Sequence, residues 1–130
     1  MNETGADSRF ALTRENGYVR VEWDEDISVT EQDALDLLDR LDQECPGVCK
    51  PMLANLNSMV TVHAPALAIF ASRLNVAALA IVGPTAVDRT IATFFSEVHE
   101  PAYPTRYFTE PAAALEWLLT PGHGAPGTEG

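Results

Sequence analysis

The 130-residue chain predicts a single α/β domain with a mixed, mostly parallel sheet that starts with a β-hairpin, in the order ββαβαβαβα. Short apolar runs bounded by turn residues alternate with segments of helical periodicity, which is typical of parallel βαβ units. At the N-terminal end, Asn16-Gly17 separates two segments of alternating polarity. This dipeptide favours an antiparallel hairpin with a type I′ turn, in which both central residues have positive φ. The length suits one domain, and 46% of the residues are hydrophobic, enough for a buried core.

The hairpin strands are expected at residues 10–14 and 18–23, where Val19, Val21 and Trp23 share one face. A helix should follow from Thr30, because Thr30 and Asp33 have the spacing of a capping box. Apolar residues recur through it with helical spacing until Pro46-Gly47 ends it. A buried strand is then expected at residues 51–56 and a second helix at residues 64–74.

The apolar run at residues 76–82, closed by Gly83-Pro84, predicts another buried parallel strand. A second capping box, Thr85 to Asp88, opens a helix. The apolar residues of that helix predict one core-facing stripe: Val87, Ile91, Phe94, Phe95 and Val98. A peripheral strand is expected at residues 105–108, followed by a last helix capped by Thr109 with Pro111 in its first turn.

The folded domain should span residues 9–119, between a flexible tail at 1–8 and a Gly- and Pro-rich flexible tail at 120–130. No apolar run is long enough to cross a bilayer, and the first ten residues have no apolar core typical of a secretory signal. A cytoplasmic location is therefore the expectation.

The net charge of −11 disfavours binding to nucleic acids and to anionic membranes. Residues 22–44 hold ten acidic residues and only Arg40 as a basic one, so this stretch carries nine of the eleven net negative charges. Either it is a solvated helix face that keeps the protein soluble, or it is a patch for a basic partner.

After the third strand the sequence reads NLNSMVTVHAPAL, from Asn55 to Leu67. Together with the element order, this segment resembles the STAS domain of bacterial anti-sigma-factor antagonists, whose loop reads roughly D-L-S-G-V-x-x-I-D-S-S-G-L. The resemblance places Asn57-Ser58 on the family's Ser-Gly and His63-Ala64 on its Asp-Ser. Further on, Ile81-Val82-Gly83, and Phe108 with Ala114, Leu115 and Trp117, look like the family's last two strands and final helix. The resemblance covers residues 9–119 and implies a STAS-like fold.

In phosphorylation-switched relatives the second residue of that Asp-Ser pair is the regulatory serine. Ala64 stands there in this chain and has no hydroxyl, so the resemblance implies that the usual switch is missing. Ser58 and Thr61 lie nearby and are the alternative acceptors. The sequence looks closest to uncharacterised actinobacterial STAS-like proteins, some described as SEC14-related, for which the resemblance implies a fold and little mechanism.

No catalytic, metal or cofactor site is expected from the residues. Cys45 and Cys49 lack a second pair of ligands for zinc and are expected to be ordinary thiols. The loop after residue 82 lacks the glycine patterns that bind nucleotide phosphates. His63 could act as a base for Ser58 or Thr61, but no third group in the sequence orients it.

The sequence therefore predicts a non-catalytic protein-interaction module. Partner contacts are expected at Asn57, Ser58, Thr61, His63 and Ala64, and a homodimer is the other use of such a surface. The aromatic residues clustered between 94 and 117 keep an alternative open, a small carrier for an apolar or lipid-like ligand.

Overall fold

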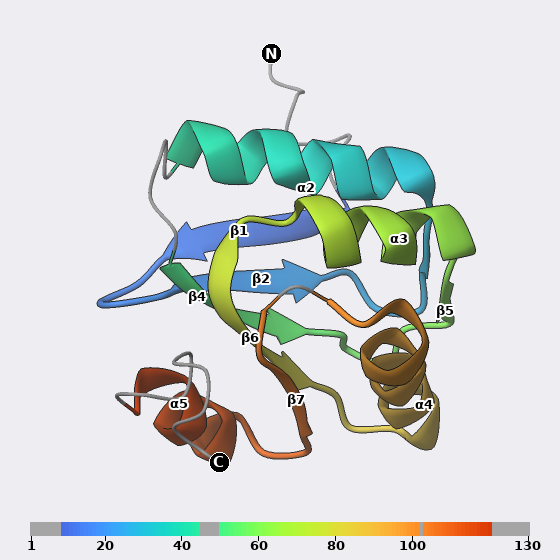
Figure 1. The fold of residues 1–130 in the computed structure, drawn as a ribbon. Coiled ribbons are helices and arrows are strands. Elements are labelled where there is room, and N and C mark those ends of the chain that lie inside the picture. The colour runs from blue at the N-terminus through green and yellow to red at the C-terminus, as the bar shows by residue number, and fades with distance from the viewer. Residues whose placement is uncertain (1–8, 45–49, 102, 121–130) are drawn as a thin grey trace.

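The computed structural model describes residues 9–44, 50–101 and 103–120. Across these ranges the main sheet has five strands: β1 (Phe10–Arg14), β2 (Val19–Trp23), β4 (Lys50–Asn55), β6 (Val76–Val82) and β7 (Thr105–Phe108). They lie in the order β1-β2-β4-β6-β7, and all neighbours are parallel except β1 and β2 (Figure 1). The predicted fold class is confirmed.

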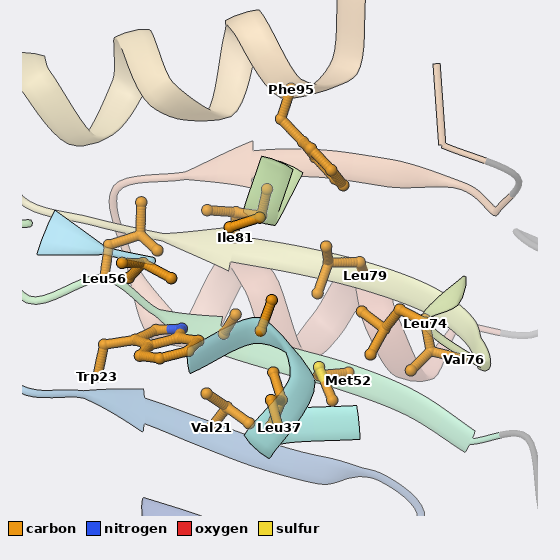
Figure 2. Close-up of a cluster of buried hydrophobic side chains, with 14 of the residues drawn as sticks. Val21, Trp23, Leu37, Met52, Leu56, Leu74, Val76, Leu79, Ile81 and Phe95 are labelled. Atoms are coloured by element: carbon orange, nitrogen blue, oxygen red, sulfur yellow. The ribbon is translucent and has the colours of Figure 1, made fainter. Parts of the chain in front are cut away.

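Helices cover both faces of this sheet. One face carries α2 (Glu31–Glu44), α3 (Ala64–Arg73), α4 (Ala86–Phe94) and the π-helical turn η1 (Phe95–His99), and the other carries α5 (Pro111–Leu119). The strands contribute side chains to the cores on both faces of the sheet, because successive side chains along a strand point to opposite faces. In β4, Met52 and Ala54 join the larger core, whereas Leu53 packs with α5. Figure 2 shows the larger core, with Phe95 projecting toward the strands.

Two short strands that the sequence did not reveal lie where the chain leaves the sheet. They are β3 (Ser28–Val29) and β5 (Thr61–Val62), and they form a parallel ladder with Ser28 opposite Thr61. A strand of two residues is too short to show a polarity pattern. This ladder ties together the segments that lead into α2 and α3.

The predicted type I′ turn of the hairpin is wrong. Gly17 has a φ of 91°, but Asn16 is not among the described residues with positive φ. Arg14 pairs with Val19, so residues 15–18 form the loop, and the Glu15 N–H donates to the Tyr18 carbonyl at 2.8 Å. A loop of this length needs only one left-handed residue, and glycine supplies it.

Both predicted capping boxes form, but the predicted cap of the last helix is wrong. Thr85 and Asp88 exchange their bonds at the start of α4, and Thr30 and Asp33 do so at the start of α2. The N-cap of α5 is Glu110 and not Thr109, and no side chain caps the helix. Pro111 is tolerated in the first turn of α5, because the backbone N–H that proline lacks would have no hydrogen-bond partner within the helix there.

The predicted core stripe of α4 is wrong in most of its residues. The buried positions are Asp88, Ala92 and Phe95, so Phe95 alone of the predicted stripe is buried. Val87, Phe94 and Val98 are exposed, at 49%, 46% and 58% respectively, and Ile91 is half-buried. The helix carries two neighbouring apolar stripes, and periodicity does not determine which of them faces inward.

Cys45, Cys49, the predicted N-terminal tail at 1–8 and residues 121–130 of the C-terminal tail lie outside the described residues. Within the described ranges, no helix is both long and apolar enough to span a bilayer.

Candidate functional site

The segment that holds the predicted contact residues begins with an unusual turn at the carboxyl end of β4. Asn57 and Ser58 both have left-handed backbone conformations, with φ of 54° and 63°. This region costs most L-residues about 1–2 kcal/mol, and asparagine tolerates it better than serine. Surrounding contacts must therefore hold the turn in place.

Asp88 supplies the main contacts from α4. Its carboxylate is fully buried and accepts hydrogen bonds from the N–H groups of Ser58 at 3.1 Å, Met59 at 2.9 Å and Thr85 at 3.3 Å. Hydrogen bonds to a charged acceptor are stronger than neutral ones. One side chain thus caps α4 and fixes the loop. The capping box was predicted from the sequence, but its second role was missed, because sequence spacing reveals no contact between residues 30 positions apart.

Gly83 makes room for this carboxylate. A Cβ built on Gly83 would lie 2.4 Å from the Cβ of Asp88, far inside normal contact. The absence of a side chain at Gly83 is therefore part of the same arrangement, at the point where β6 ends and α4 begins.

The turn is also tied to β2. The Asn57 side-chain amide donates to the Trp23 carbonyl at 2.7 Å, and the Asn57 N–H donates to Asn55 Oδ1 at 3.2 Å. The Asp26 N–H donates to the Ser58 carbonyl at 3.3 Å. Asn57 and the backbone of Ser58 are thus committed to holding the loop.

Beyond this turn, the chain presents a short exposed surface, which we call the α3-entry surface: Val60, Thr61, His63, Ala64 and Pro65. His63 is the N-cap of α3, and its N–H donates to the Val29 carbonyl at 2.9 Å. Within the described part of the chain, the side chains of Thr61 and His63 have no hydrogen-bond partner. Their backbone is held by the β3–β5 ladder and the His63–Val29 bond, and their side chains are free to contact another molecule.

The structure does not assemble the catalytic alternative. Among the described residues, no hydrogen bond links the His63 ring to the hydroxyl of Ser58 or Thr61, and no group of three metal-ligating side chains is found. At the start of α4, the Asp88 carboxylate accepts from the Thr85 N–H and the Thr85 hydroxyl accepts from the Asp88 N–H, so these two donors are already used within the capping box.

Acidic side chains flank the α3-entry surface on the side of β2. Asp24, Glu25 and Asp26 are all exposed and join β2 to β3, next to the loop through the Asp26–Ser58 bond. The exposed face of α2 adds Glu31, Asp39 and Asp42. Of these residues, Asp26 adjoins the predicted contact residues through its backbone bond to Ser58.

The larger core holds a cavity of about 60 Å³ between the sheet and the helices above it. Every residue that lines it is apolar, and Trp23, Met52, Leu79, Ile81 and Phe95 are among them (Figure 2). Drug-sized ligands occupy sites of roughly 300–1,000 Å³. This cavity is therefore suited to an apolar molecule of only a few heavy atoms.

A second hollow, of about 310 Å³, lies on the surface between the start of α4 and the start of α5. Arg89, Tyr107, Thr109 and Glu110 line it together with two other residues. The Tyr107 hydroxyl donates to the Gly83 carbonyl at 2.6 Å. Burial raises the pKa of Tyr107, the Asp88 carboxylate raises it further, and Arg89 opposes them.

A comparison with protein-family models identifies the family of this chain. A family model described as "Domain of unknown function (DUF7793)" matches residues 12–120. The chain belongs to the DUF7793 family. No curated protein matches this DUF7793 chain.

Two solved structures resemble the DUF7793 chain. One is an uncharacterised protein of the DUF3478 family from Shewanella loihica PV-4, described as having a SpoIIAA-like fold; it is 15% identical, with a TM-score of 0.58 over 84% of this chain and 91% of that one. The other, a protein of unknown function from Arthrobacter sp. FB24, is 32% identical over 85% of this chain and 100% of that one, with a TM-score of 0.34. The first likeness confirms a STAS-like fold for the DUF7793 chain.

Proposed function

We propose that this DUF7793 chain is a non-catalytic, cytoplasmic interaction module that binds a protein partner through the α3-entry surface. The observation that carries the proposal is the contrast between the two halves of the loop. Asn57 and Ser58 are clamped by Asp88 and Trp23, whereas the side chains of Thr61 and His63 are exposed and have no hydrogen-bond partner within the described part of the chain. A surface whose backbone is already held in place loses less conformational entropy on binding.

The same geometry supports an interface without a phosphorylation switch. Ala64 is the first residue of α3 and has no hydroxyl to modify. Ser58 lies against the buried Asp88 carboxylate through its N–H, so a phosphate on Ser58 would bring two anions together. Thr61 is exposed and remains the one alternative acceptor among the loop residues considered.

The charge around the surface favours a partner with basic residues. The loop is bonded to Asp26, which ends the exposed acidic run from Asp24, so lysine or arginine side chains on a partner docked there would meet carboxylates. Such charges mainly raise the association rate, and their effect weakens with salt.

A photo-crosslinking amino acid tests this proposal. Placed at Thr61 or His63, it should capture the same protein in the native host, whereas placement at Glu116, which is exposed on α5 across the sheet, should not. The double variant Asp24→Asn/Asp26→Asn should reduce the yield. Equal capture from all three positions, or none from Thr61 and His63, contradicts the proposal.

The second candidate function is binding of an apolar ligand, and the core cavity favours it. Its size supports a molecule of a few heavy atoms, smaller than benzene, and not a lipid chain. Methyl NMR under xenon pressure should show shifts at Met52 and Ile81. Ala92→Leu should fill the cavity and remove them, whereas Ala86→Leu on the exposed start of α4 should not. Unchanged spectra at saturating xenon rule out this function.

A further inference from the structure

One apolar face of the described chain is largely exposed, and of its rings Phe94 contacts only the His99 ring, at 5.6 Å between centroids. We call it the α4 stripe: Val87, Ile91, Phe94 and Val98, on α4 and η1. Three of its four side chains are about half exposed, and it lies beside the stripe of Asp88, Ala92 and Phe95 that packs on the core. A contiguous exposed apolar patch on a small domain marks an interaction site more often than scattered single residues do.

We propose that the α4 stripe is the contact between two copies of this chain, which pack α4 against α4 in antiparallel orientation. This inference is independent of the proposed function, because it uses a different set of residues from the α3-entry surface.

The spacing of the stripe is self-complementary. Its members are four, three and four residues apart, which is the spacing of the apolar seam in paired helices. This order reads the same in both directions. A two-fold axis midway between Ile91 and Phe94 therefore sets Val87 of one copy beside Val98 of the other, and Ile91 beside Phe94. A two-fold contact requires a surface that matches itself in this way.

Charge explains why a second copy fits here and not elsewhere. With a net charge of −11, most contacts between two copies would bring carboxylates together, above all across α2. The exposed residues of α4 that flank the stripe, Ala86, Thr90 and Thr93, are uncharged. In the antiparallel arrangement Glu97 falls near Thr90 of the other copy and not near a second carboxylate.

The expected dimer is weak, because a two-turn helical contact buries less than the roughly 800 Å² per partner of a standard interface. We expect a dissociation constant on the order of 10 µM. Sedimentation velocity from roughly 1 µM to roughly 1 mM should show a rising average mass with this midpoint.

Variants locate the contact. Phe94→Glu should raise the dissociation constant by at least about tenfold, since it places two carboxylates in the seam. Leu119→Glu alters an equally exposed apolar residue outside the stripe, at 49%, and should leave the constant unchanged. Circular dichroism and the urea midpoint of each variant show whether the fold is retained.

Isotope-filtered NOEs test the orientation in the unmodified protein. A sample that mixes labelled and unlabelled copies should give contacts between the Ile91 methyl groups of one copy and the Phe94 ring of the other. A chain that stays monomeric at all concentrations overturns the proposal, as does a dimer that survives Phe94→Glu or is broken by Leu119→Glu. If the dimer forms as expected while crosslinking at Thr61 finds no partner, only the proposed function fails.

Discussion

Replacing Asp88 with asparagine should release the loop at Ser58 and Met59 from α4 while leaving the shape of the side chain intact. The carboxylate accepts from Met59 through Oδ1, and from Ser58 and Thr85 through Oδ2. An asparagine has one acceptor oxygen, so its NH2 group must face at least one of these N–H donors. No rotation of the side chain satisfies all three.

The expected magnitude follows from those contacts. A hydrogen bond to a charged group contributes about 1.5–3 kcal/mol, and a buried donor left unpaired costs about 1–3 kcal/mol. With one bond lost and the others weakened to neutral ones, Asp88→Asn should lower the free energy of unfolding by about 3 kcal/mol. Asp88→Ala removes all three bonds from a fully buried position and should cost about 4 kcal/mol or more.

Two measurements test this reasoning. Urea unfolding gives the global loss of stability, and native-state hydrogen exchange reports the Ser58 and Met59 amides individually. Asp33→Asn is the matched control. Asp33 is also buried and caps α2 through the N–H and hydroxyl of Thr30, but it has no bond to the loop. It should lower global stability without selectively exposing Ser58 and Met59 to exchange.

A particular pattern would refute the assignment. If Asp88→Asn costs less than about 1 kcal/mol, or if its effect on loop exchange equals that of Asp33→Asn, the carboxylate acts as a helix cap only.

Three further predictions follow from named contacts. Gly83→Ala should cost about 3 kcal/mol in urea unfolding, because its Cβ would overlap that of Asp88. Gly17→Ala should cost about 1 kcal/mol, because Gly17 has a φ of 91° but a Cβ there would make only an ordinary contact with Leu119, at 3.8 Å. Ser58→Gly should stabilise by a few tenths of a kcal/mol, because glycine adopts a φ of 63° without strain; a loss of thermal stability would contradict this. Burial raises the pKa of Tyr103, so its contribution to stability is present below the unfolded-state pKa of about 10 and is lost as the pH rises above it. Tyr103→Phe should flatten the fall in unfolding free energy above pH ~10, and it should cost about 1 kcal/mol at neutral pH for the bond to the Phe70 carbonyl.

The sheet and its helices were predictable because their signals are local. Alternation at Val19, Val21 and Trp23 gives one buried face of β2, and the structure buries all three. The run at 76–82 is apolar throughout because β6 is central and covered on both faces. Capping boxes also need only neighbouring residues, and both predicted boxes form.

The features that escaped prediction depend on tertiary contacts. The sequence shows two apolar stripes on α4, and only packing decides that the one containing Phe95 faces the core. The β3–β5 ladder pairs residues 33 positions apart over two residues each, and no pattern that short is informative. The predicted contact residues are contiguous in sequence, but their division into clamped and exposed halves comes from Asp88 and Trp23, which lie far from them in the chain.

The β3–β5 ladder also bears on how the molecule would open. Both α2 and α3 begin two residues after their short strand ends, and the two strands are bonded in register by Val60 and His63 to Ile27 and Val29. The ladder thus joins the starts of the two helices, which lie side by side over the same face of the sheet (Figure 1). Separating either helix from the sheet would therefore strain the ladder that holds the start of the other. Such an opening would be cooperative, and the amides of α2 and α3 would exchange together at one common rate.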